Sequence, residues 1–165
     1  MKIKKKALLY EIANMAFVIA DTGQDSNHSL HRVKDICEEG NIDRVARILG
    51  LAYSQLITIL FPILTPIRID PDRDFSATPH DYEFSFRREA STGFPLTKEI
   101  QLQIKETIHE YMVCMVLADC LEVTLPEAAD VWKFRTSAAF SNLKDMVATV
   151  AGSSSFGFSR RINPF

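Results

Sequence analysis

The sequence contains few cysteines, and their positions form neither a metal-binding nor a disulfide pattern. There are only three, Cys37, Cys114 and Cys120, and no pair has the C-x-x-C spacing. An odd number without such spacing is typical of neither a zinc site nor a disulfide framework. We therefore expect reduced, buried thiols, as in proteins made in the cytosol.

The sequence also lacks a hydrophobic run long enough to cross a membrane. Its N-terminal lysines precede an apolar stretch, residues 7–20, which imitates a secretory signal peptide. This stretch is shorter than the roughly 20 residues that a membrane span needs, and Glu11 and Asn14 interrupt it. Its apolar positions have helical spacing: Leu8, Ile12, Met15 and Ile19. This spacing favours a packed first helix, and a signal peptide is the alternative.

No motif for catalysis or cofactor binding is present. The sequence has no glycine-rich phosphate loop and no nucleophile elbow. His109 and Glu110, with Asp119 further along, could form an acid–base set, but no nucleophile accompanies them. His28 and His31 have the spacing of two ligands on one side of a helix, but no third ligand is near in sequence. We expect neither enzyme activity nor a bound cofactor.

One acidic segment imitates a calcium-binding loop. Asp70, Asp72 and Asp74 alternate as the ligands of such a loop do. The loop needs glycine at its sixth position for a sharp turn, and Phe75 occupies that position here. We interpret the segment as a solvated acidic turn and expect no bound metal.

The chain carries little net charge. The formal value is −2, so no overall positive field attracts nucleic acid. Basic residues cluster near the two ends of the sequence, in residues 2–6 and at Arg160 and Arg161. Charged ends of this kind are usually solvated, and a contact with phosphate or an acidic partner is the alternative.

What the sequence does contain is a mainly helical pattern in a single domain, residues 1–151. Apolar residues at helical spacing predict a bundle of about five helices. Their expected ranges are residues 3–20, 29–39, 42–61, 97–121 and 126–151. Asn41 and Thr97 are favourable N-cap residues, and Pro126 suits a first helical turn. The helix over residues 42–61 has the longest apolar stripe, and we expect it to be central.

The last two predicted helices form a helical hairpin. A short turn, Thr124-Leu125-Pro126, joins them. Large apolar residues recur along the second helix, and we expect them in the core: Trp132, Phe134, Phe140, Leu143 and Val147.

Residues 65–90 change from the helical to the strand period. Ile67–Ile69 and Tyr82–Arg87 alternate apolar and polar residues, so we expect them to pair as a β-hairpin inserted in the helical domain. An isolated hairpin is marginally stable, so it must lean on the helices or on another subunit. Charged residues along it suit an edge that is open to a partner. The partner-binding residues predicted in this hairpin are Tyr82, Phe84 and Phe86.

Residues 152–165 form a C-terminal arm rich in glycine and serine. The arm has no packing period, so it cannot build a core of its own. Its aromatic residues are therefore expected to be buried in a groove of another chain or of the same bundle. The partner-binding residues predicted in the arm are Phe156, Phe158, Arg160, Arg161 and Phe165.

The helical hairpin and the arm also carry a family resemblance. Three runs contribute to it, Ile108–Val113, Val116–Leu121 and Val123–Ala129, and the chain closes on an Arg-Arg and then a Pro-Phe pair within Arg160–Phe165. These residues resemble the small neck proteins of tailed bacteriophages, most closely those of phages and prophages of gut anaerobes. Proteins of this family are head–tail connectors, or adaptors, which form a ring on the portal.

The resemblance implies a virion structural protein that is made in the host cytoplasm and located in the neck. It implies a homo-oligomeric ring that links the portal to the tail and contacts other neck or tail proteins. Contact with a membrane is not expected, and DNA would be passing cargo only. The alternative is a cytosolic helical module that binds or regulates another protein without catalysis.

Overall fold

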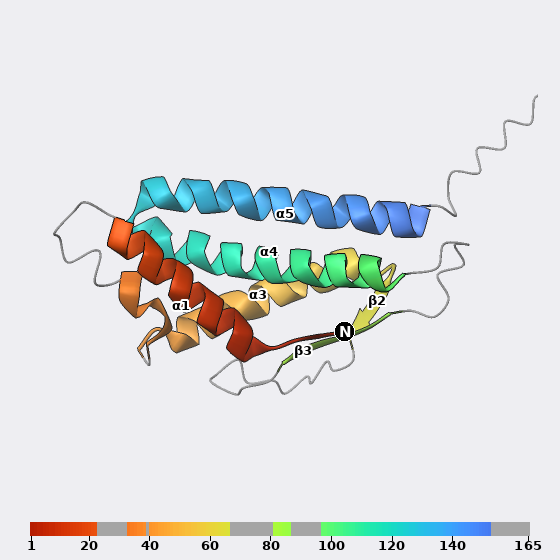
Figure 1. The fold of residues 1–165 in the computed structure, drawn as a ribbon, viewed down its shortest axis with the longest axis horizontal. Coiled ribbons are helices and arrows are strands. Elements are labelled where there is room, and N and C mark those ends of the chain that lie inside the picture. Colours follow the sequence, from red (N-terminus) through yellow and green to blue (C-terminus); the bar gives the residue numbers. More distant parts are fainter. Residues whose placement is uncertain (23–32, 39, 67–80, 87–96, 153–165) are drawn as a thin grey trace, which may run out of the picture.

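The computed structural model describes residues 1–22, 33–38, 40–66, 81–86 and 97–152, and the fold is given for these residues. The described chain is mainly helical, with a small antiparallel sheet (Figure 1). Its long helices are α1 (Lys5–Thr22), α3 (Ile42–Leu60), α4 (Lys98–Thr124) and α5 (Pro126–Gly152).

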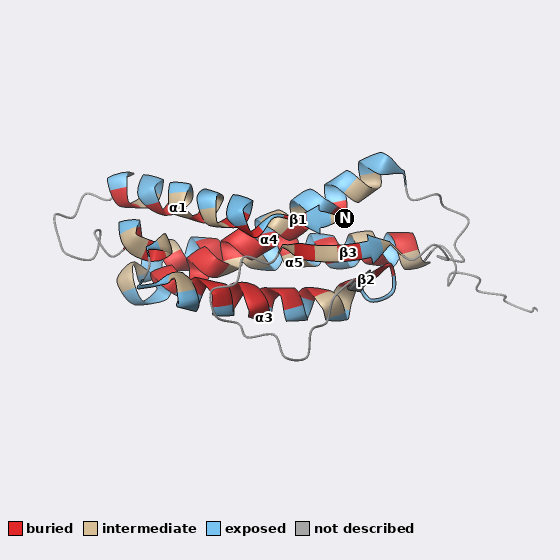
Figure 2. Ribbon diagram, turned by 90° about the horizontal axis from the view of Figure 1, so that it is seen from below, coloured by how far each residue is buried: buried red, intermediate tan, exposed pale blue. Residues whose placement is uncertain are grey.

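Helix α4 lies at the centre, and α1, α3 and α5 pack against it. Its middle is buried on all faces, since Tyr111–Cys114 and Val116–Ala118 are buried at consecutive positions. Figure 2 shows the buried side of α1 turned toward α4. The prediction that the helix over residues 42–61 is central is wrong. That helix, α3, buries one stripe and exposes residues such as Arg47, whereas a central helix needs apolar residues all round.

Helices α4 and α5 form the predicted helical hairpin. The Thr97 hydroxyl accepts a hydrogen bond from the backbone nitrogen of Ile100 at 3.4 Å, so Thr97 caps α4 as predicted. Helix α4 continues beyond the predicted end at residue 121 to Thr124, and Leu125 alone separates it from α5. Pro126 is the first residue of α5, as its fixed φ angle allows.

The first predicted helix is confirmed as a packed helix with shifted bounds. Helix α1 begins at Lys5 and not at Ile3, because the residues before it form strand β1 (Lys2–Ile3). Its buried residues are spaced by four: Leu8, Ile12, Ala16 and Ala20. This stripe faces the core. It contains Leu8 and Ile12 as predicted, whereas the predicted Met15 and Ile19 are only half-buried beside it.

The second predicted helix, residues 29–39, lies largely outside the described residues. The described part contains a short 3₁₀ helix, η1 (Asp35–Cys37). Asn41 occupies the predicted N-cap position of α3, but its side chain makes no capping hydrogen bond. The Asn41 amide instead donates to the backbone oxygen of Asp35 at 2.9 Å. Asn41 thus ties the start of α3 to η1.

Three strands form the sheet, in the order β1, β3, β2. Strand β3 (Tyr82–Phe86) pairs antiparallel with β1 and with β2 (Leu64–Pro66). The strand predicted from Tyr82 is confirmed, whereas its predicted partner, Ile67–Ile69, lies outside the described residues. Strand β3 itself has a paired strand on both sides and offers no open edge. The other residues on which the open edge of the hairpin was predicted lie outside the described residues.

The sheet packs on α3 through the aromatic face of β3. Tyr82 and Phe84 are buried, while Glu83 between them is half-buried on the other face, as the alternation of a strand requires. The ring of Tyr53 in α3 lies 5.0 Å from the ring of Tyr82 and 5.2 Å from that of Phe84, in tilted arrangements. Aromatic contacts of this geometry are favourable, so Tyr53 joins the sheet to the helices.

Candidate interaction surfaces

Helix α5 carries the first candidate surface. Its buried residues face α4 and include Ala129, Trp132, Leu143 and Val147. On the opposite side, Val131, Phe134 and Ala138 are spaced by three and four residues, so they share one face. The Phe134 side chain is 75% exposed. We call Val131, Phe134 and Ala138 the outer face of α5.

The prediction that Phe134 lies in the core is therefore wrong. Phe134 follows Trp132 by two residues, which is about 200° around a helix of 3.6 residues per turn. The two rings therefore cannot both face α4. Trp132 takes the buried place, and the guanidinium of Arg135 stacks on its ring at 4.7 Å.

Helix α1 carries a second exposed apolar face. Tyr10 is 76% exposed, and Phe17 is exposed two helical turns later on the same side. The amine of Lys34 lies 5.0 Å from the centre of the Phe17 ring, within the range of a cation–π contact. We call Tyr10 and Phe17 the outer face of α1.

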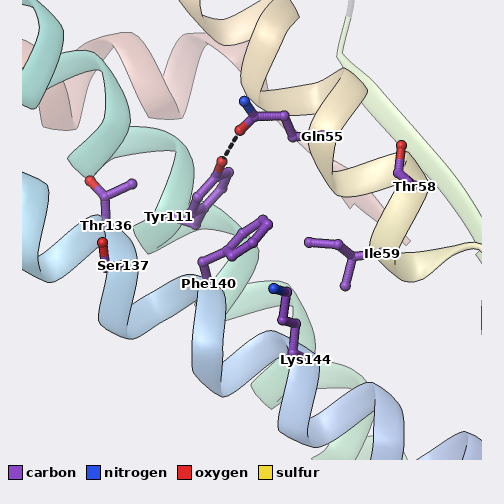
Figure 3. A pocket seen from close by; sticks show the side chains of 8 residues that line it. All are labelled: Gln55, Thr58, Ile59, Tyr111, Thr136, Ser137, Phe140 and Lys144. Atoms are coloured by element: carbon purple, nitrogen blue, oxygen red, sulfur yellow. Dashed lines mark hydrogen bonds between the residues drawn. The ribbon is translucent and has the colours of Figure 1, made fainter.

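A groove between α3 and α5 is the third candidate surface (Figure 3). Its volume is about 550 Å³, which falls within the range of sites that bind small molecules or side chains. Tyr111 of α4 lies between the two walls. The other lining residues are Gln55, Thr58 and Ile59 of α3 and Thr136, Ser137, Phe140 and Lys144 of α5. We call this surface the α3–α5 groove.

Aromatic and polar contacts fix the side chains of the groove. The Tyr111 hydroxyl donates a hydrogen bond to the Gln55 side-chain oxygen, and burial raises the pKa of this phenol, so it remains a neutral donor. The rings of Tyr111 and Phe140 stack with their centres 5.4 Å apart, and the Lys144 amine lies 4.7 Å from the Phe140 ring. The groove thus has an aromatic floor below polar rims.

The described thiols are protonated at neutral pH. Burial raises the pKa of Cys114 to about 12, with a further contribution from the nearby Glu110 carboxylate. Burial likewise raises the pKa of Cys120 to about 11, and it raises the pKa of Cys37. All three cysteines are free, as expected. Because the thiolate is the reactive form, the structure activates none of them.

The predicted acid–base residues make separate contacts. His109 Nε2 of α4 lies 2.6 Å from Glu11 Oε2 of α1. Asp119 instead pairs with Arg44 of α3, at 2.8 Å between Nη2 and Oδ1. Glu110 accepts a hydrogen bond from Cys114 within α4. His109 and Asp119 are therefore not brought into one site, and each joins α4 to a neighbouring helix.

The predicted partner-binding residues of the β-hairpin lie mostly inside the molecule. Tyr82 and Phe84 belong to the core between the sheet and α3, and Phe86 is half-buried against it. The prediction that Tyr82 and Phe84 form a partner surface thus conflicts with their burial within this chain. The arm was predicted to begin at residue 152, but Gly152 is the last residue of α5. The remaining residues of the predicted arm, 153–165, lie outside the described residues.

Metal binding was not expected at any of the candidate clusters. Within the described ranges, no group of three or more His, Cys, Asp or Glu side chains is placed to hold a metal ion. His28, His31 and the acidic residues at 70, 72 and 74 lie outside these ranges. None of the described helices is both long and apolar enough to span a bilayer.

The sequence pattern failed to reveal the outer faces and the α3–α5 groove. The groove depends on which helices neighbour one another, and no periodicity encodes that arrangement. The outer face of α5 is nevertheless visible in the sequence, because Val131 and Phe134 are apolar residues that do not fit the helical spacing of the buried residues of α5. No family model, curated protein or solved structure matches this chain.

Proposed function

We propose that the chain is a virion structural protein of a tailed phage or prophage, acting as a subunit of the head–tail connector ring between portal and tail. The resemblance of residues 108–129 and of the Arg160–Phe165 tail to phage neck proteins suggests this function. The structural observation that carries it is the presence of two separate exposed apolar faces, on α1 and α5.

A ring requires two different surfaces on each subunit. In a head-to-tail contact, one patch of a subunit binds a different patch of the next, and the contact repeats until the ring closes. Phe134 on α5 and Tyr10 on α1 are the most exposed aromatic side chains of the described residues. We assign the outer face of α5 in one subunit to bind the outer face of α1 in the next.

The burial of β3 changes which segments can reach the portal and tail. Tyr82 and Phe84 are enclosed by the subunit itself, which leaves the C-terminal arm as the predicted segment for these contacts. Aromatic and arginine residues are common anchors in protein interfaces. The arm combines both types, in Phe156, Phe158, Phe165 and the arginine pair Arg160 and Arg161.

A cytosolic protein-binding module is the second candidate function. The α3–α5 groove favours it, because an aromatic floor between polar rims suits a short peptide from a partner. Such a module would work as a monomer or dimer. Oligomeric state therefore distinguishes the two functions.

The experiment measures the mass of the purified protein by light scattering, alone and mixed with the portal protein of the phage or prophage that carries it. A connector forms a closed ring or binds the portal. Phe134→Glu should abolish ring formation and leave the circular dichroism spectrum unchanged, because Phe134 is exposed. Leu102→Glu is the matched control, since Leu102 is an exposed apolar residue of α4. A protein that remains monomeric alone and with the portal would contradict the proposal.

A further inference from the structure

We propose that the α3–α5 groove binds the C-terminal arm, residues 153–165, of the same subunit. The inference does not depend on the connector function, because it concerns the subunit before it meets any partner. It rests on the position of the groove, on where α5 ends and on the side chains of the arm.

The arm begins at the right distance from the groove. Lys144 and Phe140 precede Gly152, the last residue of α5, by about 12 and 18 Å along a helix that rises 1.5 Å per residue. An extended chain advances about 3.3 Å per residue, but a reversal after Gly152 first takes about three residues and brings residue 155 beside residue 152. Phe158 then lies about 10 Å back along α5, near Lys144, and Ile162 lies about 23 Å back, beside Ser137, at the same rise per residue.

The arm has the side-chain pattern that such a groove requires. In an extended segment, residues two apart point to the same side, so Phe156 and Phe158 face the groove together. Gly157 between them has no side chain, which lets the backbone approach α5 closely. The two rings would extend the aromatic floor that Tyr111 and Phe140 begin.

The chemistry of the rims suits an extended backbone. Gln55 and Thr58 on α3, with Thr136 and Ser137 on α5, bring hydrogen-bonding side chains to both sides of the floor. A peptide backbone offers an N–H and a C=O at nearly every residue, and these need partners when they are covered. The groove therefore supplies both the apolar contact and the polar partners.

The test forms a disulfide between the arm and the groove in the full-length protein. Ile162→Cys, which keeps both aromatic rings of the arm, is combined with Ser137→Cys, which lines the groove, or with Ala138→Cys, the next residue, on the outer face of α5. Both positions on α5 are exposed and nearly equally far from Gly152. The native thiols are largely buried with raised pKa values. Oxidised glutathione drives bond formation, and mass spectrometry identifies the products.

We expect the disulfide from residue 162 to residue 137 to form within one chain, about tenfold faster than the bond to residue 138, since docking raises the effective concentration of the arm. Thr58→Arg, an exposed change in the opposite wall, should abolish this preference. Equal rates at the two positions would overturn the proposal. A bond between two chains whose rate rises with protein concentration would also overturn it, because the groove would then serve a second copy.

Discussion

The backbone nitrogen of Lys5 donates a hydrogen bond of 3.1 Å to the carboxylate of Asp81, a residue 76 positions away. Lys5 is the first residue of α1, where backbone N–H groups have no partner within the helix. The amine of Lys2 lies 2.9 Å from the other oxygen of Asp81. One carboxylate at the start of β3 thus caps α1 and fixes β1.

This arrangement predicts a loss of stability in acid. The Lys2 amine, and then the Lys5 N–H, hold the pKa of Asp81 below its ordinary value of 3.8. Because the folded-state pKa is lowered, the charged carboxylate stabilises the fold above about pH 4, and this contribution disappears as the pH falls through the folded pKa. Asp81→Asn should lower the melting temperature at pH 7 and reduce its change between pH 5 and pH 2.5.

Thermal melts over that pH range check the prediction. Asp43→Asn is the control, since Asp43 is an exposed carboxylate in the first turn of a different helix, α3. The control should keep the acid dependence of the wild type. If Asp81→Asn and the wild type lose the same stability between pH 5 and pH 2.5, the cap does not depend on the charge of Asp81.

The central position of α4 predicts a strong contrast between two leucines of that helix. Leu117 is 0% exposed and Leu102 is 54% exposed. Leu117→Ala should lower the free energy of unfolding by about 2–5 kcal/mol, because it removes buried methyl groups and leaves a cavity. Leu102→Ala should change it by less than about 0.5 kcal/mol. Urea denaturation measures both values, and similar losses would contradict the assignment of α4 as the core helix.

The sequence predicts the parts of this fold in which one pattern decides the structure. Helices α1, α3, α4 and α5 have apolar spacing, and Thr97 caps α4 as its type suggests. Strand β3 follows from the alternation of Tyr82–Phe86. Strand β1 could not be predicted, because two residues cannot show a period. Strand β3 pairs with β1 and packs on Tyr53, so the residues of β3 that were predicted to bind a partner are buried in the core instead.

The candidate surfaces are less predictable, for a related reason. Phe134 and Phe140 are the same residue type on one helix, yet one is exposed and the other half-buried against Tyr111. Which of them faces a neighbour depends on where α3 and α4 lie around α5. The sequence does indicate that the C-terminal arm is a candidate binding segment, because the composition of the arm does not allow it to form a core of its own.

The contact between Tyr111 and Gln55 predicts a measurable coupling across the α3–α5 groove. Tyr111→Phe removes the donated hydrogen bond and keeps the stacking on Phe140. We expect it to lower the free energy of unfolding by about 0.5–1.5 kcal/mol, the net contribution of a typical hydrogen bond. Tyr10→Phe is the matched control, since Tyr10 is exposed.

A double-mutant cycle with Gln55→Ala isolates this interaction from other effects of the two changes. Stability is measured by urea denaturation of the wild type, the two single variants and the double variant. A hydrogen bond between these side chains requires that Tyr111→Phe cost less in the Gln55→Ala background. Strictly additive losses would show that the two side chains do not interact in solution.

The head-to-tail arrangement proposed for the ring predicts a specific complementation. Tyr10→Glu damages the outer face of α1 and leaves that of α5 intact, whereas Phe134→Glu does the reverse. Each variant alone should remain monomeric, because ring growth needs both faces on every subunit. Mixed together, one intact face of each kind can still meet, so the pair should form a heterodimer and stop there.

Native mass spectrometry of the mixture, with one variant isotopically labelled, distinguishes the arrangements. The head-to-tail contact predicts mixed dimers and no larger species. If α5 instead bound α5 of a second copy, Tyr10→Glu would dimerise by itself and Phe134→Glu would not join it. Leu102→Glu should assemble as the wild type does, because Leu102 lies on neither outer face. Rings of full size formed by Tyr10→Glu alone would show that α1 takes no part in the contact, and the assignment of Tyr10 to the interface would be wrong.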